Sequence, residues 1–156
     1  MDKYPLADVT YKVIGAAMEV HTELGPGFLE PVYHEALGIE MGRRDILFDD
    51  QPQIEISYKD VALQKRYIPD FLVVGEVVVE IKALSRLSSI EEAQIINYLK
   101  AAKRRVGLLV NFGASSLEFK RFVYENGEVE EPKQKNLRQS AKSVDKRETG
   151  NDPWFE

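Results

Sequence analysis

The sequence lacks cysteine altogether and contains only two histidines. Without cysteine the chain can form no disulfide and no thiolate zinc site, and two histidines argue against a His-rich metal centre. A metal centre in this chain would therefore be built from oxygen ligands, which suit hard divalent cations.

The sequence also lacks a long apolar run and an excess of positive charge. No run approaches the roughly 18 apolar residues that span a membrane. The N-terminal MDKYPLAD lacks the basic segment and apolar core of a signal peptide. We therefore expect a cytoplasmic protein with no membrane partner. The net charge of −5 argues against a large non-specific nucleic-acid footprint but leaves room for a local basic groove.

Length and composition are those of one globular domain. The chain has 156 residues and 44% hydrophobic content, enough for a sizeable core. We expect a folded domain over residues 1–130 and a polar, flexible tail over residues 131–156. Near its end, Trp154 and Phe155 could dock on the body or on another subunit, so a homo-oligomer is left open.

The most informative stretch, YIPDFLVVGEVVVEIKAL, predicts a β-hairpin with Gly75 as its turn. The two expected strands are Tyr67–Val74 and Glu76–Leu84. A hairpin centred on Gly75 pairs Asp70 with Glu80, with their Cβ atoms about 5 Å apart. Side chains alternate along a strand, so Glu80 and Lys82 share a face.

Two facing carboxylates in an apolar hairpin repel each other and are costly to bury. A divalent cation would offset both costs, and Mg²⁺ sites commonly use one or two carboxylates. Alternatively, Asp70 ends a strand, and Glu80 and Lys82 are solvated on an exposed face. That explanation is the simpler one for any single residue, but the combined spacing favours a metal site with Lys82 one strand step away.

Two helices are expected before the hairpin. The first spans Val9–Leu24 with Asp8 as its N-cap, and His21 beside its apolar stripe is better explained by packing than by catalysis. The second spans Pro31–Arg43, which puts Glu30 at or near the N-cap. There Glu30 either stabilises the helix dipole or faces the carboxylate site. Tyr33 shares its helix face.

A third helix, Ile90–Arg104, is expected after the hairpin, because Ser88 with Glu91 and Ser89 with Glu92 form capping boxes. Its expected buried stripe is Ala93, Ile96, Leu99, and Ala102 or Lys103. Gln94 and Tyr98 share a face. The cations near its end complement the helix dipole or contact phosphates; they are Lys100, Lys103, Arg104 and Arg105. The other expected strands are Gln53–Tyr58, Val61–Arg66, Val106–Phe112 and an edge strand, Leu117–Tyr124.

Pro69-Asp70 followed by Glu80-Ile81-Lys82 resembles the signature of the PD-(D/E)XK nuclease superfamily. The upstream GFLEPVY, residues 27–33, matches G-x-x-E-x-x-Y, the signature of the GxxExxY family in that superfamily. Gln94-x-x-x-Tyr98 is similar to the Q-x-x-x-Y motif of RecB-like members. The resemblance covers about residues 9–124.

The resemblance implies an α/β fold with a restriction-endonuclease-like core, in which a mixed β-sheet with a central hairpin is flanked by helices. It implies a metal-dependent nuclease that hydrolyses phosphodiester bonds of nucleic acid, with DNA as the expected partner and Mg²⁺, or Mn²⁺ in its place, as cofactor. By resemblance, Asp70, Glu80 and the Ile81 carbonyl bind the metal, and Glu30 adds a carboxylate.

The remaining roles also follow from the resemblance. Lys82 orients the attacking water and stabilises developing charge, in preference to acting as a base. Gln94 and Tyr98 position catalytic groups and substrate. The expected substrate contacts are Tyr33, Lys100, Lys103 and Arg104. The alternative is a weakly active or inactive nuclease-fold module that binds nucleic acid or a protein, or a structural subunit of a larger complex.

Overall fold

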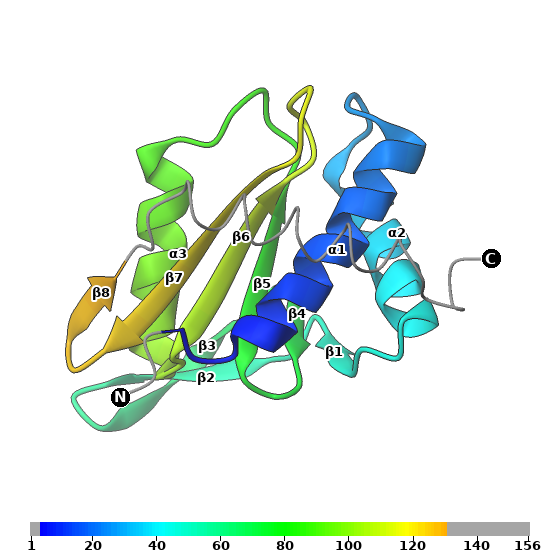
Figure 1. Cartoon of the computed structure of the whole chain (residues 1–156). Coiled ribbons are helices and arrows are strands. Elements are labelled where there is room, and N and C mark those ends of the chain that lie inside the picture. Colours follow the sequence, from blue (N-terminus) through cyan, green and yellow to red (C-terminus); the bar gives the residue numbers. More distant parts are fainter. Residues whose placement is uncertain (1–3, 131–156) are drawn as a thin grey trace.

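The computed structural model describes residues 4–130, so the tail expected at 131–156 lies outside the described residues. Three helices and a six-stranded mixed sheet form its body (Figure 1). The helices are α1 (Ala7–Leu24), α2 (Glu30–Arg43) and α3 (Ser89–Ala102). The strands are β1 (Phe48–Asp50), β2 (Ile54–Tyr58), β3 (Val61–Tyr67), β4 (Phe71–Val73), β5 (Val77–Lys82), β6 (Val106–Asn111), β7 (Glu118–Glu125) and β8 (Glu128–Glu130).

The large sheet has the order β1-β4-β5-β6-β7-β8, while β2 and β3 form a separate two-stranded sheet. Only β5 and β6 run parallel, and α3 makes the crossover between them. The other neighbouring strands of the large sheet are antiparallel. This is the expected α/β architecture, a mixed sheet with a central hairpin flanked by helices. Within residues 4–130, no helix combines the length and hydropathy that crossing a membrane would need.

The hairpin formed by β4 and β5 has the predicted register. Phe71 pairs with Val79 and Val73 with Val77, so the pairing is centred on Gly75. Val74 and Gly75 both have positive φ, and the Glu76 N–H donates to the Val73 carbonyl at 3.0 Å. One position further along this register, Asp70 comes opposite Glu80.

The hairpin's first strand is shorter than predicted, because Tyr67 belongs to β3 in the other sheet. There Tyr67 pairs with Ile54, and the chain changes sheets over Ile68 and Pro69. Proline has no N–H to donate and is disfavoured within a strand pair, so a break at Pro69 is physically reasonable.

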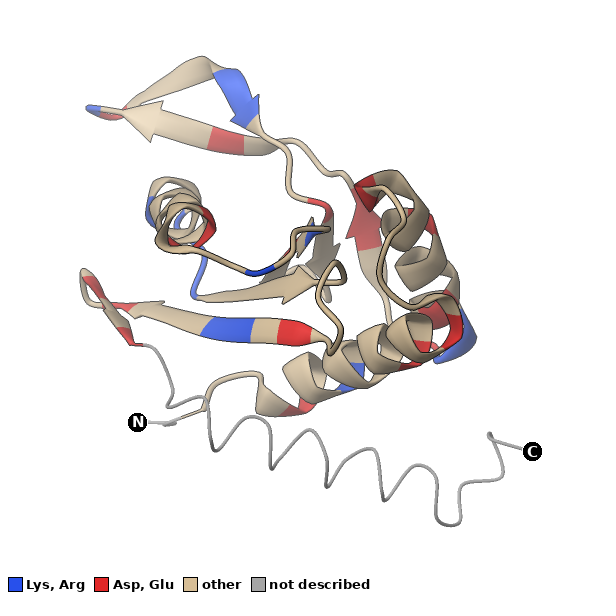
Figure 2. Ribbon diagram, turned by 90° about the horizontal axis from the view of Figure 1, so that it is seen from above, with Lys and Arg blue, Asp and Glu red and all other residues tan. Residues whose placement is uncertain are grey.

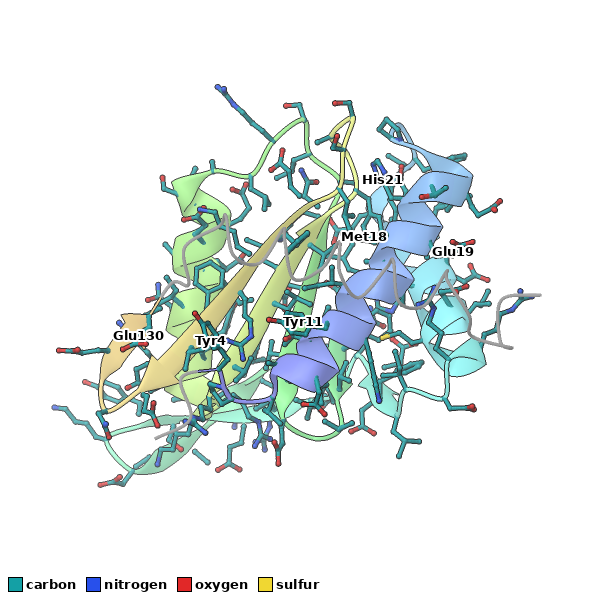
Figure 3. All side chains as sticks on the ribbon, viewed as in Figure 1. Tyr4, Tyr11, Met18, Glu19, His21 and Glu130 are labelled. Carbon is teal, nitrogen blue, oxygen red and sulfur yellow. The ribbon has the colours of Figure 1, made fainter. Side chains whose placement is uncertain are left out.

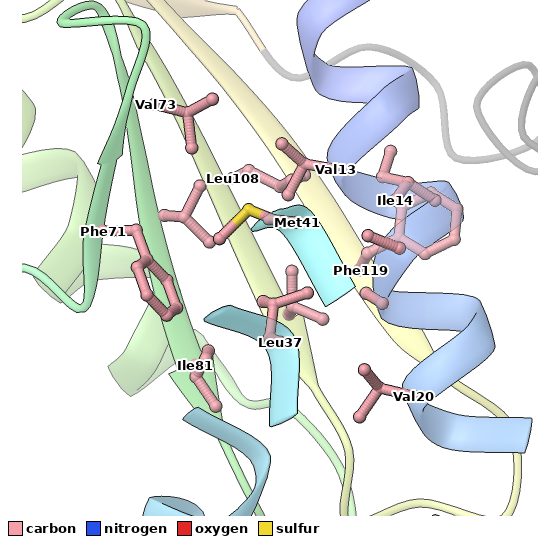
Figure 4. Close-up of a cluster of buried hydrophobic side chains, with 14 of the residues drawn as sticks. Val13, Ile14, Val20, Leu37, Met41, Phe71, Val73, Ile81, Leu108 and Phe119 are labelled. Atoms are coloured by element: carbon pink, nitrogen blue, oxygen red, sulfur yellow. The ribbon is translucent and has the colours of Figure 1, made fainter. Parts of the chain in front are cut away.

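The two faces of β5 carry different neighbours. Val77, Val79 and Ile81 belong to one buried cluster with residues of α1 and α2. Figure 4 shows Ile81 in this cluster. Val78 faces the opposite side, where it joins a second cluster with residues of α3 and the β2–β3 sheet. Because strand side chains alternate, Glu80 projects toward this second side at the polar end of β5.

Several boundaries and faces differ from the sequence expectations. Helix α1 begins at Ala7 after Leu6, which has positive φ, so Asp8 lies in the first turn and is not the N-cap. Helix α2 begins at Glu30 itself, and its N-cap is Leu29. The Ser88 capping box with Glu91 is confirmed.

At its other end, α3 stops at Ala102 because Lys103 adopts a left-handed conformation, so Arg104 lies beyond the helix. Its buried stripe is Ile95, Leu99 and Ala102, and Ala93 is exposed, because the helix packs against Gly107 through Ile95 and Leu99.

Strand β7 is not an edge strand, since the Asn126-Gly127 turn folds β8 back beside it. The three-residue strands β1 and β8 were not predicted.

Candidate active site

Asp70 lies immediately before β4 and is tied to the end of β5. Its Oδ2 accepts a hydrogen bond from the Ile81 N–H at 2.7 Å. Its own carbonyl accepts from the Gln51 N–H, next to β1, at 2.9 Å. Two strands therefore fix the Asp70 backbone and carboxylate beside the signature residues of β5.

The Ile81 carbonyl is directed to the same place. In a strand, the N–H and C=O of one residue point to the same side and alternate along the chain. Lys82 bonds toward β6, as its carbonyl accepts from the Phe112 N–H at 2.9 Å. The Ile81 groups therefore point the other way, past the end of β4. The hairpin register puts Pro69 opposite, and proline has no N–H to occupy the Ile81 carbonyl.

Glu80 is partly buried and is held by a tyrosine. The Tyr67 hydroxyl donates to Glu80 Oε1 at 2.5 Å. Burial raises the pKa of Glu80 to about 7; the Tyr67 hydrogen bond and Lys82 lower it, while Asp70 and Glu30 add to the rise. Burial of the Tyr67 hydroxyl, together with the charge of Glu80, raises the pKa of Tyr67 far above its usual range. Tyr67 therefore remains a protonated donor.

Glu30, in the first turn of α2, adds a third carboxylate to this electrostatic group. Although much of its side chain is accessible to solvent, partial desolvation and the charge of Asp70 raise its pKa, which Lys82 and His34 partly counteract. Acidic segments of α2 and β1 lie on the same side of the molecule in Figure 2. The three carboxylates together create a site whose negative charge a cation would stabilise.

His34, which the sequence analysis did not select, bridges two of the acidic residues. Its Nδ1 lies 3.0 Å from Asp70 Oδ1, and its Nε2 lies 2.6 Å from Asp50 Oδ1. Burial opposes protonation of the ring, but the hydrogen bonds to Asp50 and Asp70 outweigh it and raise the pKa of His34.

Lys82 lies on the same face of β5 as Glu80, toward α3 and its two motif residues, Gln94 and Tyr98. Lys82 Nζ donates to Gln94 Oε1 through a long contact of 3.5 Å. Tyr98 stacks on Tyr67 with 3.9 Å between ring centroids. The exposed face of α3 lines an open depression of about 610 Å³ beside these residues. Its lining residues are Ser89, Ile90, Ala93, Gln94, Asn97 and Tyr98.

The four residues expected to contact substrate lie outside the group of Asp70, Glu80 and Lys82, and their contact with substrate stays a prediction. Tyr33 is fully buried, and its hydroxyl donates to the Gly25 carbonyl at 2.6 Å, which argues against direct substrate contact. At 1.5 Å per residue, Lys100 lies about 9 Å along α3 from Gln94, and Lys103 caps the end of the helix. Arg104 follows the end of the helix.

His21 was expected to have a packing role and not a catalytic one. In the structure its Nε2 lies 2.9 Å from the Ala114 carbonyl oxygen, a contact that fits packing. Figure 3 shows His21 toward the C-terminal end of α1.

The donor set fits an oxygen-liganded cation. Within residues 4–130, no three His, Cys, Asp or Glu side chains form a ready set of metal ligands. The set here is different, because it combines two carboxylates with a carbonyl: Asp70, Glu80 and Ile81. Mg²⁺ is commonly held by one or two carboxylates and keeps several waters, so these three oxygen donors are of the type and number that a Mg²⁺ site uses.

Comparison with protein families gives a match to the PD-(D/E)XK nuclease superfamily over residues 7–122. The chain belongs to this superfamily. Its members are in general nucleases, typically dependent on divalent metals, which supports an enzyme of nuclease type acting on nucleic acid. No curated protein sequence matches the chain.

Three residues beside the candidate site were not expected from the sequence: His34, Tyr67 and Asn111. His34 stands four residues after Glu30 on the same helix, a spacing that could have revealed it. Tyr67 precedes Asp70 by three residues, but the strand composition around it predicts a place in the hairpin. Asn111 is buried, and its side chain bonds both the N–H and the carbonyl of Leu84, at 2.8 and 2.9 Å, just beyond Lys82. No local pattern signals that contact.

Proposed function

We propose that this chain is a divalent-metal-dependent nuclease that hydrolyses phosphodiester bonds, with DNA as the expected substrate. The observation that carries the proposal is the hydrogen bond from the Ile81 N–H to Asp70 Oδ2, which fixes the Asp70 carboxylate beside the residue that lies between Glu80 and Lys82 in β5. It gains weight because the chain belongs to a superfamily of nucleases. The GFLEPVY segment supports the narrower assignment to the GxxExxY family, with residues 1–130 as the nuclease domain.

The proposed metal ligands are Asp70, Glu80 and the Ile81 carbonyl. Glu30 contributes directly or through water. A bound Mg²⁺ or Mn²⁺ would stabilise charge on the phosphate oxygens and lower the pKa of the attacking water. Lys82 orients that water and stabilises developing negative charge.

Around this group, Gln94 holds the Lys82 ammonium by their contact, and Tyr98 packs on the ring beside Glu80. Lys100, Lys103 and Arg104 are proposed to contact phosphates further along the nucleic acid. Tyr33 is proposed to act indirectly, by holding the Gly25 loop that leads into the helix of Glu30.

The test is a calorimetric titration of Mn²⁺ and Mg²⁺ into the wild type and into Asp70→Ala/Glu80→Ala, followed by a cleavage screen with single- and double-stranded DNA and RNA. We expect binding and cleavage by the wild type and neither by the double variant. The matched control is Glu76→Ala, which removes an exposed carboxylate from the turn of the same hairpin.

Two results would contradict the proposal. If the wild type bound neither ion at millimolar concentration and cleaved no substrate, a non-catalytic binding module would replace it. If the double variant cleaved as well as the wild type, the residue assignment would be wrong even though the enzyme class stood.

A further inference from the structure

We propose that Tyr67 is a positioning residue that orients Glu80 for the metal, and that Tyr98 acts on the site through Tyr67. This inference rests on the proposed function. It assigns a task to a residue outside the two signatures and gives Tyr98 of the Gln94-x-x-x-Tyr98 motif an indirect role.

The Tyr67 hydroxyl fixes one oxygen of Glu80. An ionised carboxylate only accepts hydrogen bonds, so in the 2.5 Å contact the hydroxyl donates to Oε1. Among residues 4–130, no hydrogen-bond donor reaches Oε2. The bond therefore holds Oε1 toward β3 and leaves Oε2 to face a cation.

The Tyr67 ring has little freedom to move away from this position. Only 4% of Tyr67 is exposed, and it belongs to the cluster beneath α3. Its backbone is paired with Ile54 at the end of β3. Its place is thus decided by the separate β2–β3 sheet and not by the hairpin that carries Glu80.

Tyr98 completes the arrangement from α3. The two tyrosine rings lie 3.9 Å apart at their centroids with an interplanar angle of 4°, so they stack face to face. Tyr98 makes no hydrogen bond to Glu80; the contact that reaches the carboxylate belongs to Tyr67. Tyr98 therefore influences Glu80 by confining the ring that touches it.

The pair offers a matched experiment, because each tyrosine can lose its hydroxyl and keep its ring. Mn²⁺ is titrated by calorimetry into the full chain carrying Tyr67→Phe or Tyr98→Phe. Loss of a group that orients a metal ligand typically weakens metal affinity about 10–100-fold. We expect that loss for Tyr67→Phe and less than about a twofold change for Tyr98→Phe, with both melting curves cooperative. Tyr98→Ala, which removes the stack, should weaken affinity less than Tyr67→Phe does.

The outcomes separate this inference from the function on which it rests. If the wild type binds Mn²⁺ and Tyr67→Phe binds it equally well, the positioning role is refuted while the nuclease proposal stands. If both phenylalanine variants weaken binding equally, the effect is not specific to the Glu80 contact, and the role is also refuted. If the wild type binds no Mn²⁺, the positioning role fails, and the nuclease proposal fails as well only if Mg²⁺ does not bind and no substrate is cleaved. Should Tyr67→Phe not fold, an unchanged affinity in Tyr98→Ala refutes the action of Tyr98 through Tyr67.

Discussion

His34 joins Asp70 to a strand at the edge of the sheet: its Nδ1 contacts Asp70 at 3.0 Å and its Nε2 contacts Asp50 of β1 at 2.6 Å. A ring protonated at both nitrogens would donate to both carboxylates, and despite burial of the ring these two hydrogen bonds raise the pKa of His34. The ring also stacks on Phe71, with 4.4 Å between centroids. Helix α2, strand β1 and the start of β4 thus all contribute to the orientation of Asp70.

Replacing His34 by alanine should weaken Mn²⁺ binding by about 10–100-fold, because Asp70 loses the donor that orients Oδ1. Calorimetric titration measures the change. Glu35→Ala removes the next, exposed side chain of α2 and should leave the affinity unchanged. Equal affinity in His34→Ala and the wild type would mean that the Ile81 N–H alone suffices to hold Asp70.

His34 should also make stability depend on pH. Its folded-state pKa lies above the ordinary 6.5, so its contribution is fully present below about pH 6.5 and is lost as pH rises through the raised pKa. The contribution should be about 1–2 kcal/mol, reduced by solvent screening at the exposed Asp50. The melting temperatures of wild type and His34→Ala, followed from pH 5.5 to 9, should converge with increasing pH. A constant difference would contradict this.

Lys82→Met should separate catalysis from metal binding. The substitution removes the charge proposed to act on water and phosphate, so cleavage should fall about 10²–10³-fold. Mn²⁺ affinity should hold or increase, because a positive charge beside the carboxylates is gone. Lys12→Met, on the exposed side of α1, is the control and should change neither quantity. Loss of Mn²⁺ binding in Lys82→Met would require a different role for this lysine.

Glu80→Gln should stabilise the metal-free protein at alkaline pH. The pKa of Glu80 is raised from 4.5 to about 7, so ionising it destabilises the fold progressively as pH rises across that interval. The variant should have a higher melting temperature than the wild type at pH 8 and the same melting temperature at pH 4.5. Each kcal/mol of added stability should raise the melting temperature by about 2–4 °C. Saturating Mn²⁺ should reverse the order at pH 8, because only the wild type would bind tightly. Glu76→Gln should show neither effect.

Gly113 should be intolerant of a side chain because of its contact with the chain after β5. A Cβ there would lie 2.3 Å from the Leu84 carbonyl oxygen and 2.5 Å from the Leu84 nitrogen. Gly113→Ala should cost about 1–3 kcal/mol in thermal or denaturant unfolding. Gly42→Ala in α2 meets no atom within 4 Å and should be neutral or stabilising. Equal stability of the two variants would contradict the packing described for this turn.

The sequence alone determined the chemistry and much of the local structure. The absence of cysteine excluded thiolate ligands, and alternation around Gly75 predicted the register that sets Asp70 opposite Glu80. The signatures indicated the superfamily and the α/β fold. Those features depend on strand alternation, turn residues and spacing, which act over short stretches of chain and are therefore visible in the sequence.

Only the tertiary structure decided which oxygens remain for a cation and which residues hold the others. His34 contacts Asp70 across 36 positions of the sequence because α2 packs on one face of the sheet. Tyr67 contacts Glu80 because β3, which carries Tyr67, pairs with β2 in a second sheet. Packing also buried Tyr33, whose hydroxyl donates to the Gly25 carbonyl. Such contacts depend on how whole helices and strands pack together. The periodicity of residues within one helix or strand does not indicate which other element packs against it.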